Sequence, residues 1–198
     1  MTHASSHDGI DPAASTLPLA GLKVLDCATL FAGPVVSMVM GDFGADVIKV
    51  EHPRGDSLRG LGWHKEGESL WWTVVARNKR CITLDLRQPA GQELFHQLLD
   101  VTDVLIVGNR PSALERWGLD FATLSASNPR LVMTHISGFG QTGPLAGQAG
   151  FGSVGEAMGG IRYTTGSPDR PPSRAGVSLG DALASVFGVI GTLSALLV

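Results

Sequence analysis

Short apolar runs recur along the chain and are separated by longer segments of mixed polarity. The runs are rich in Val, Ile and Leu, which is typical of buried strands. Several of the intervening segments carry helical patterns, and this alternation predicts an α/β fold, with a Rossmann-like parallel sheet and flanking helices. Strands are expected at 21–27, 46–51, 81–86, 103–107 and 131–136, and helices at 33–43, 88–100 and 114–118.

The last 16 residues, 183–198, contain no charged side chain. This run is shorter than the roughly 20 residues that a membrane span needs, and it lacks basic and aromatic flanks. We therefore expect a buried helix and no membrane partner. A helix that is apolar on every side is normally covered on every side, so we expect the chain to be a fragment or to depend on a partner subunit.

Asp181 lies between a glycine and this apolar run. Burial of a carboxylate is costly unless it is hydrogen-bonded or neutralised. The first turn of a helix supplies both backbone N–H groups and the positive end of the helix dipole. Two interpretations stay open from the residues alone: an N-cap aspartate, which is the commoner case, and a nucleophilic or acid–base carboxylate.

Glycine-rich and proline-containing segments, 137–160 and 164–173, lead into Asp181. Long loops in a compact chain are usually functional. A basic cluster at 77–80 is either a solvated face or a clamp for phosphate. The segment 57–72 is expected to be irregular.

Composition narrows the class of protein. Of 198 residues, 43% are hydrophobic and 17% are charged, so the chain is globular. Its net charge of −3, without a basic block, argues against a nucleic-acid partner. Cys27 and Cys81 lack metal-ligand spacing and are expected to be buried thiols in a reducing, cytoplasmic setting. Residues 1–17 are expected to be a disordered lead, and 18–198 to form the domain.

A set of motifs, in this order, resembles the class III CoA-transferase family, which includes formyl-CoA transferase and carnitine CoA-transferase. The motifs are GLKVLD at 21–26, AGP at 32–34, GADVIKVE at 44–51, NKR at 78–80, LERWG at 114–118, NPRL at 128–131, GFGQTGP at 138–144 and GD at 180–181. The resemblance covers 18–198. It implies the N-terminal part of a large Rossmann-like CoA-binding domain with active-site loops, from an interlocked homodimer.

Members of this family are about twice as long, so the chain resembles their N-terminal half and lacks the remainder of the fold. It would pair either with a second copy or with a complementing C-terminal chain, and it could be inactive alone. The substrates implied are an acyl-CoA and a carboxylic acid.

The family's catalytic aspartate matches Asp181. The implied mechanism passes through an aspartyl anhydride and an aspartyl-CoA thioester, with coenzyme A as a thioester substrate and no bound cofactor or metal. The run 163–172 resembles members that use dicarboxylate donors such as succinyl-CoA. Arg162, Arg170 or Arg174 could meet the distal carboxylate, although surface arginines are the commoner case.

The resemblance also implies contacts with CoA, made by a loop after the first strand, by the basic cluster and by the glycine-rich segment. The implied residues are Leu30, Phe31, Ala32, His52, Ala76, Arg77, Asn78, Lys79, Arg116, Ser137, Gly138, Phe139 and Gly140.

Two alternatives stay open. An α-methylacyl-CoA racemase-like isomerase would need a histidine where this chain has Phe151, which cannot move a proton. His135, the histidine nearest in sequence, lies within a strand pattern and is expected to be a core residue or one that supports the site without contacting substrate. The other alternative is a non-catalytic, truncated CoA-binding subunit.

Overall fold

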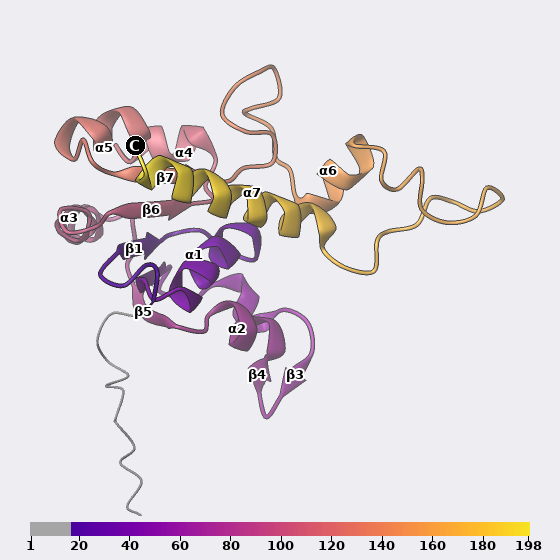
Figure 1. Cartoon of the computed structure of the whole chain (residues 1–198), viewed down its shortest axis with the longest axis horizontal. Coiled ribbons are helices and arrows are strands. Elements are labelled where there is room, and N and C mark those ends of the chain that lie inside the picture. Colours follow the sequence, from indigo (N-terminus) through magenta and orange to yellow (C-terminus); the bar gives the residue numbers. More distant parts are fainter. Residues whose placement is uncertain (1–16) are drawn as a thin grey trace, which may run out of the picture.

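A computed structural model describes residues 17–198, so the expected lead at 1–17 lies outside the described residues except for Leu17. Five parallel strands form one sheet in the order β5-β2-β1-β6-β7 (Figure 1). The order places β1 in the middle and sends the chain outward in both directions, as in a doubly wound α/β sheet. The strands are β1 (Lys23–Asp26), β2 (Asp46–Glu51), β5 (Lys79–Thr83), β6 (Val104–Val107) and β7 (Val132–His135).

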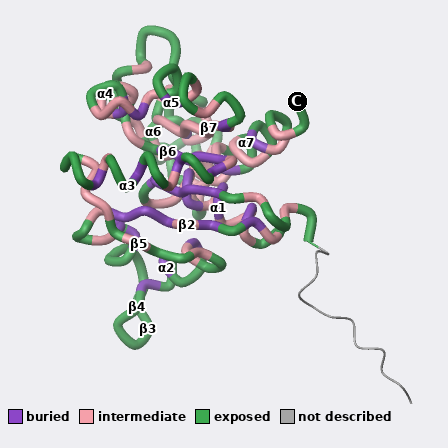
Figure 2. The backbone as a smooth tube through the Cα atoms, turned by 90° about the vertical axis from the view of Figure 1, so that its left-hand side faces the viewer, coloured by how far each residue is buried: buried purple, intermediate pink, exposed green. Residues whose placement is uncertain are grey.

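Alternate residues of each central strand supply two separate cores. Leu25 and Leu105 join one hydrophobic cluster, whereas their neighbours Val24 and Val104 join the other. Figure 2 shows the buried residues following the central strands. Burial on both faces explains why these strands read as continuous apolar runs in the sequence.

Helices cover the two faces. On one face, helices α3 (Pro89–Leu99), α4 (Pro111–Arg116) and α5 (Phe121–Ser127) contribute Phe95, Leu99, Leu114 and Leu124 to the first cluster. On the other face, α1 (Ala32–Asp42) contributes Val36 and Met40, and α7 (Leu179–Leu196) packs across α1 and β7. The predicted α/β class with a parallel sheet and flanking helices is therefore confirmed.

Helix α7 approaches α1 closely because Gly188 faces it. A β-carbon at residue 188 would lie 2.8 Å from Cγ2 of Val36. Ser185 donates a hydrogen bond to the Ala32 carbonyl at 2.9 Å.

Among the described residues, α7 is the one helix long and apolar enough to cross a membrane by length and composition alone. The absence of a membrane partner stays a prediction.

The segment expected to be irregular, 57–72, is more ordered than predicted. It holds the 3₁₀ helix η1 (Ser57–Gly60), a hairpin of β3 (His64–Lys65) and β4 (Glu68–Ser69), and the start of α2 (Leu70–Val75). Glu66 and Gly67 turn the hairpin with positive φ angles of 54° and 86°. Leu58, Trp72 and Val75 form a small core of their own.

The third strand of the sequence begins earlier than expected. It was predicted at 81–86, but β5 pairs with β2 from Lys79 opposite Val47 to Thr83 opposite Glu51. As an edge strand, β5 leaves Cys81 exposed, so the prediction of a buried thiol is wrong there. Cys27 is buried as predicted, and burial strongly raises the pKa of its thiol. The predicted cytoplasmic location is untested.

Candidate functional site

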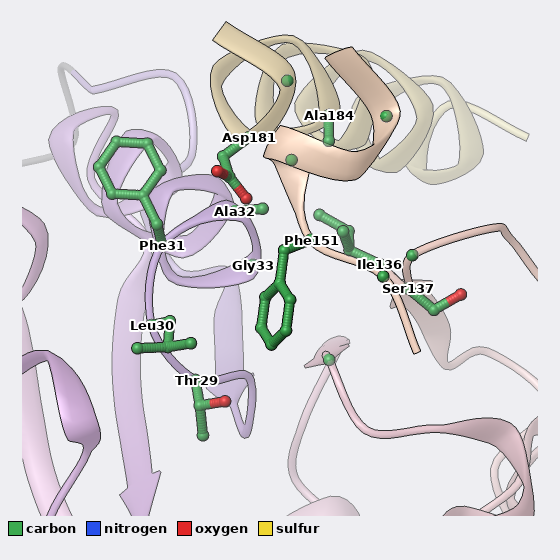
Figure 3. A pocket seen from close by; sticks show the side chains of 16 residues that line it. Thr29, Leu30, Phe31, Ala32, Gly33, Ile136, Ser137, Phe151, Asp181 and Ala184 are labelled. Atoms are coloured by element: carbon green, nitrogen blue, oxygen red, sulfur yellow. The ribbon is translucent and has the colours of Figure 1, made fainter. Parts of the chain in front are cut away.

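A cavity of about 230 Å³ lies where loops leave the carboxyl ends of the central strands. Open parallel sheets bind ligands at this edge. The loop after β1, the ends of β6 and β7, and the N-terminal ends of α6 (Gly152–Met158) and α7 meet there (Figure 3). The lining residues are Thr29, Leu30, Phe31, Ala32, Gly33, Gly108, Ile136, Ser137, Gly138, Gly150, Phe151, Gly152, Gly155, Gly180, Asp181 and Ala184.

Two buried aspartates hold the loop after β1. Asp26 accepts a hydrogen bond from the backbone N–H of Ala28 at 3.1 Å, and Asp56 accepts one from that of Leu30 at 3.1 Å. Leu30 has a φ of 65°, a conformation that costs a non-glycine residue energy and therefore needs such support. The loop is thus fixed before any ligand binds.

These aspartates belong to a buried network with two lysines. Lys49 lies 3.0 Å from Asp56 and 3.7 Å from Asp26, and Lys79 lies 2.9 Å from Asp26. Burial alone would lower the pKa of Lys49, but Asp26 and Asp56 outweigh it and raise the pKa. Burial lowers the pKa of Lys79 because Asp26 compensates only in part. Two anions and two cations balance each other beneath the cavity loop.

Asp181 lies in the first turn of α7 but is not its N-cap. The N-cap is Ser178, whose side chain makes no capping hydrogen bond. The N-cap interpretation of Asp181 is therefore wrong, because the helix begins earlier, at Leu179. Figure 3 shows the carboxylate directed toward the loop that carries Phe31 and Ala32.

The pKa of Asp181 is raised above its usual value. Partial burial is the main cause, and the negative charge of Glu156 adds to it. The nearby backbone of Gly152 and the positive charge of Arg174 act in the opposite direction and lower the pKa.

Glycines permit close backbone contacts around Asp181. A β-carbon at Gly180 would lie 2.4 Å from the carbonyl oxygen of Gly152, and one at Gly152 would lie 2.4 Å from Oδ2 of Asp181. A β-carbon at Gly138 would likewise lie 2.5 Å from Cα of Gly150. The glycines of 137–160 therefore allow α6 and the loop after β7 to pack closely against the start of α7.

Glu156 is a residue of this region that the sequence analysis missed. It lies on α6, is 1% exposed, and accepts a hydrogen bond from the backbone N–H of Gly180 at 3.0 Å. A glutamate within a glycine-rich, short helical segment gave no periodic signal of burial. Only its spatial proximity to Asp181 reveals it.

The structure brings six of the predicted site residues together around the cavity. They are Leu30, Phe31, Ala32, Ser137, Gly138 and Asp181. Phe139 and Gly140 lie beside the cavity without lining it: the ring of Phe139 lies against Gly150, and the carbonyl of Gly140 accepts a hydrogen bond from Ser137 at 3.0 Å.

The basic cluster is engaged within the fold. Arg77 and Asn78 both donate to Asp42, and Ala76 ends α2. The Lys79 side chain is 1% exposed and paired with Asp26. The ammonium group of Lys79 therefore belongs to the buried ion-pair network, and the predicted contact of Lys79 with CoA remains untested.

His52 lies in a second hollow of about 140 Å³, where its Nε2 is 2.8 Å from Nη2 of Arg87. Thr29 lines both hollows, which makes them neighbours. Arg116 is exposed on α4, beside Trp117, which lines the second hollow. The predicted contacts of these residues with CoA remain untested.

His135 is half-buried, and its Nε2 lies 2.6 Å from the carbonyl oxygen of Asn109. Burial lowers the pKa of this histidine, and it does not line the cavity. Its position, half-buried and outside the cavity lining, agrees with a residue that supports the region without contacting substrate. Within residues 17–198, no group of three or more His, Cys, Asp or Glu side chains is placed to hold a metal ion.

Comparison with known proteins connects this geometry to a family. Residues 19–198 match the family model described as CoA-transferase family III. A succinyl-CoA–D-citramalate CoA-transferase of Chloroflexus aurantiacus is 52% identical over 90% of this chain and 45% of that protein. The beta subunit of a succinyl-CoA–L-malate CoA-transferase of the same organism is 45% identical over 94% of this chain and 47% of that protein.

A solved structure has the same fold. The crystal structure of a CAIB/BAIF family protein from Brucella suis superposes with a TM-score of 0.88 and 41% identity, over 92% of this chain and 50% of that chain. The chain thus spans about half the length of the relatives that it matches.

Proposed function

The chain belongs to CoA-transferase family III, and from that premise we propose that it takes part in moving coenzyme A from succinyl-CoA to a carboxylic acid, with Asp181 as the nucleophile. One observation carries the proposal. The Asp181 carboxylate lines the same cavity as Leu30, Phe31 and Ala32, the loop that the resemblance aligns with CoA. A nucleophile and a thioester-binding loop must meet at one point for acyl transfer.

The proposed reaction has two covalent stages. A carboxylate oxygen of Asp181 attacks the thioester carbonyl, the C–S bond breaks, and CoA leaves as thiolate, which gives an aspartyl–succinyl anhydride. The thiolate then attacks the aspartyl carbonyl and expels succinate, which leaves an aspartyl-CoA thioester. The acceptor acid reverses these two steps and departs as its CoA thioester. An anhydride and a thioester are both activated acyl groups, so neither stage is a trap.

The cavity supports these steps. Its lining is mostly apolar or glycine, and exclusion of water on substrate binding would protect the anhydride from hydrolysis. The N-terminal turn of α7 favours the negative charge of the attacking carboxylate. We propose that backbone N–H groups of the glycine segments stabilise the oxyanion of each tetrahedral intermediate.

Succinyl-CoA as the donor rests on the relatives. Both Chloroflexus relatives cited above are named CoA-transferases of succinyl-CoA and a second acid. The acceptor acids in their names differ, so we propose only the class, a small carboxylic acid. The racemase alternative is not favoured: Phe151 lies in the cavity where that reaction needs a second proton-transferring side chain.

We also propose that a second copy of the chain covers the outer face of α7, as the resemblance implies. That face exposes Leu183, Val186, Phe187 and Ile190. Contiguous exposed apolar side chains mark protein contacts. Light scattering after gel filtration tests this: a dimer is expected, and a monomer that forms a stable complex only with a separate chain would establish the complementing-chain alternative.

Trapping tests the nucleophile. The chain is incubated with succinyl-CoA and then with hydroxylamine, and peptides are read by mass spectrometry. A hydroxamate at Asp181 that requires succinyl-CoA is expected, absent in Asp181→Asn and unchanged in Asp169→Asn, which alters an exposed loop carboxylate. Bound CoA without any hydroxamate would overturn catalysis by this chain and favour the non-catalytic CoA-binding subunit.

A further inference from the structure

Glu156 is a buried carboxylate, and only one of its two oxygens accepts a hydrogen bond. It is 1% exposed. Its Oε1 accepts the Gly180 N–H at 3.0 Å, whereas its Oε2 has no hydrogen-bond partner among the described residues. No cation in residues 17–198 lies within ion-pair distance of it. Burying a carboxylate without a cation lowers the stability of the fold. A carboxylate kept in such a place next to the candidate site is therefore a candidate for a role at that site.

The bond to Gly180 replaces a missing helix cap. The first N–H groups of a helix lack partners within it, and the Ser178 side chain caps none of them in α7. Glu156 reaches across from α6 to satisfy the N–H of the residue directly before Asp181. The backbone contact between Gly152 and Gly180 brings the two helix ends together.

We propose that Glu156 is a positioning residue for Asp181: its hydrogen bond fixes the turn that carries the nucleophile, and its charge disfavours the free Asp181 carboxylate. The second half of this inference rests on the proposed function. When Asp181 attacks the thioester, its negative charge passes to the departing thiolate and the aspartyl group becomes neutral. Repulsion from Glu156 is then relieved, so Glu156 favours acylation of Asp181 over the free carboxylate.

The charges around Asp181 support this role. Glu156 on α6 raises the pKa of Asp181 in addition to burial, and Arg174, in the loop before α7, lowers it. The other residues that line the cavity carry no charge. Glu156 is therefore the one anion that α6 presents to the nucleophile within the described residues.

The test separates charge from hydrogen bonding. The carboxyl carbon of Asp181 is titrated by NMR in the ¹³C-labelled full chain and assigned with Asp181→Asn. Glu156→Gln keeps an acceptor for the Gly180 N–H, and we expect it to lower the pKa of Asp181 by roughly 0.5 unit or more without faster exchange of the Gly180 amide. Glu156→Asp keeps the charge but is one methylene shorter, and should speed that exchange about tenfold.

Glu93→Gln, at an exposed position on α3, is the matched control and should change neither quantity. An unchanged pKa of Asp181 in Glu156→Gln, or unchanged exchange at Gly180 in Glu156→Asp, would overturn the inference. If Glu156→Gln does not fold, Glu156→Asp still tests the hydrogen bond. Because neither readout needs catalysis, absence of the hydroxamate with both effects present would refute the proposed function alone.

Discussion

Oδ2 of Asp181 occupies the space that a side chain at Gly152 would need: a β-carbon there would lie 2.4 Å from this oxygen and 2.7 Å from the Asp181 backbone nitrogen. Both distances are too short for real contacts. The nucleophile proposed here is thus directed into the cavity partly by the absence of a side chain on a different helix.

Gly152→Ala is therefore expected to displace the Asp181 carboxylate and to slow hydroxamate formation from succinyl-CoA by about tenfold to a hundredfold, since small misplacement of a nucleophile is expensive. Gly147→Ala is the matched control, because a β-carbon at 147 meets nothing within 4 Å. Equal rates in the two variants would show that the carboxylate is not restrained by Gly152.

The pH dependence of acylation is expected to follow the ionisation of Asp181. Only the carboxylate attacks, so the initial rate of hydroxamate formation rises with pH as Asp181 loses its proton. Because burial and Glu156 raise the pKa of this group from 3.8, the midpoint of the rise is expected above 3.8. Background trapping in Asp181→Asn is subtracted at each pH. A midpoint at or below 3.8 would contradict the environment described for Asp181.

Lys79→Met is expected to lower the free energy of unfolding, whatever its effect on CoA binding. The substitution leaves Asp26 buried without one of its two lysine partners, and loss of one member of a buried ion pair typically lowers the free energy of unfolding by about 3–5 kcal/mol. Urea denaturation measures this change. A loss below about 1 kcal/mol would mean that Lys49 alone neutralises Asp26 and that Lys79 is free for another role.

Arg116→Ala should show the opposite pattern. Its side chain is exposed, and its Nε donates only to the carbonyl of Ser112 in its own helix, so the free energy of unfolding should change by less than about 0.5 kcal/mol. If Arg116 meets a CoA phosphate, the dissociation constant of CoA measured by calorimetry should rise about tenfold. Arg130→Ala, also exposed, is the control. Identical CoA affinity in both variants would remove Arg116 from the site.

The strands of the sheet could be predicted from the sequence because both faces of the sheet are buried. The apolar run at 104–107 marks β6 with little ambiguity, and β2, where Val47, Ile48 and Val50 lie among charged residues, also has the predicted bounds. The edge strand β5 was placed two residues late because its first two residues, Lys79 and Arg80, are cationic and lie outside the apolar pattern. Local sequence does not reveal that β2 pairs with it from Lys79 onward.

Only some residues of the candidate site could be predicted from the sequence. Asp181 and the loop at Leu30 are adjacent to elements that the sequence predicts, and the resemblance supplied their roles. The burial of Lys79 could not be predicted, because a cation in a run of cations is usually exposed and its partner Asp26 is distant in sequence. Glu156 was missed for the same reason: its partner, the backbone N–H of Gly180, belongs to a different helix.

Gly138 and Gly150 touch through their backbones at the cavity wall. The chain between them leaves this point as a projecting loop and returns to it (Figure 1). A loop closed at its base in this way is mechanically separate from what lies beneath it. Residues 141–148 can therefore be lengthened, shortened or replaced by a labelled peptide while Asp181 keeps its surroundings, which makes this excursion the place to attach a probe or to graft the corresponding loop of a relative.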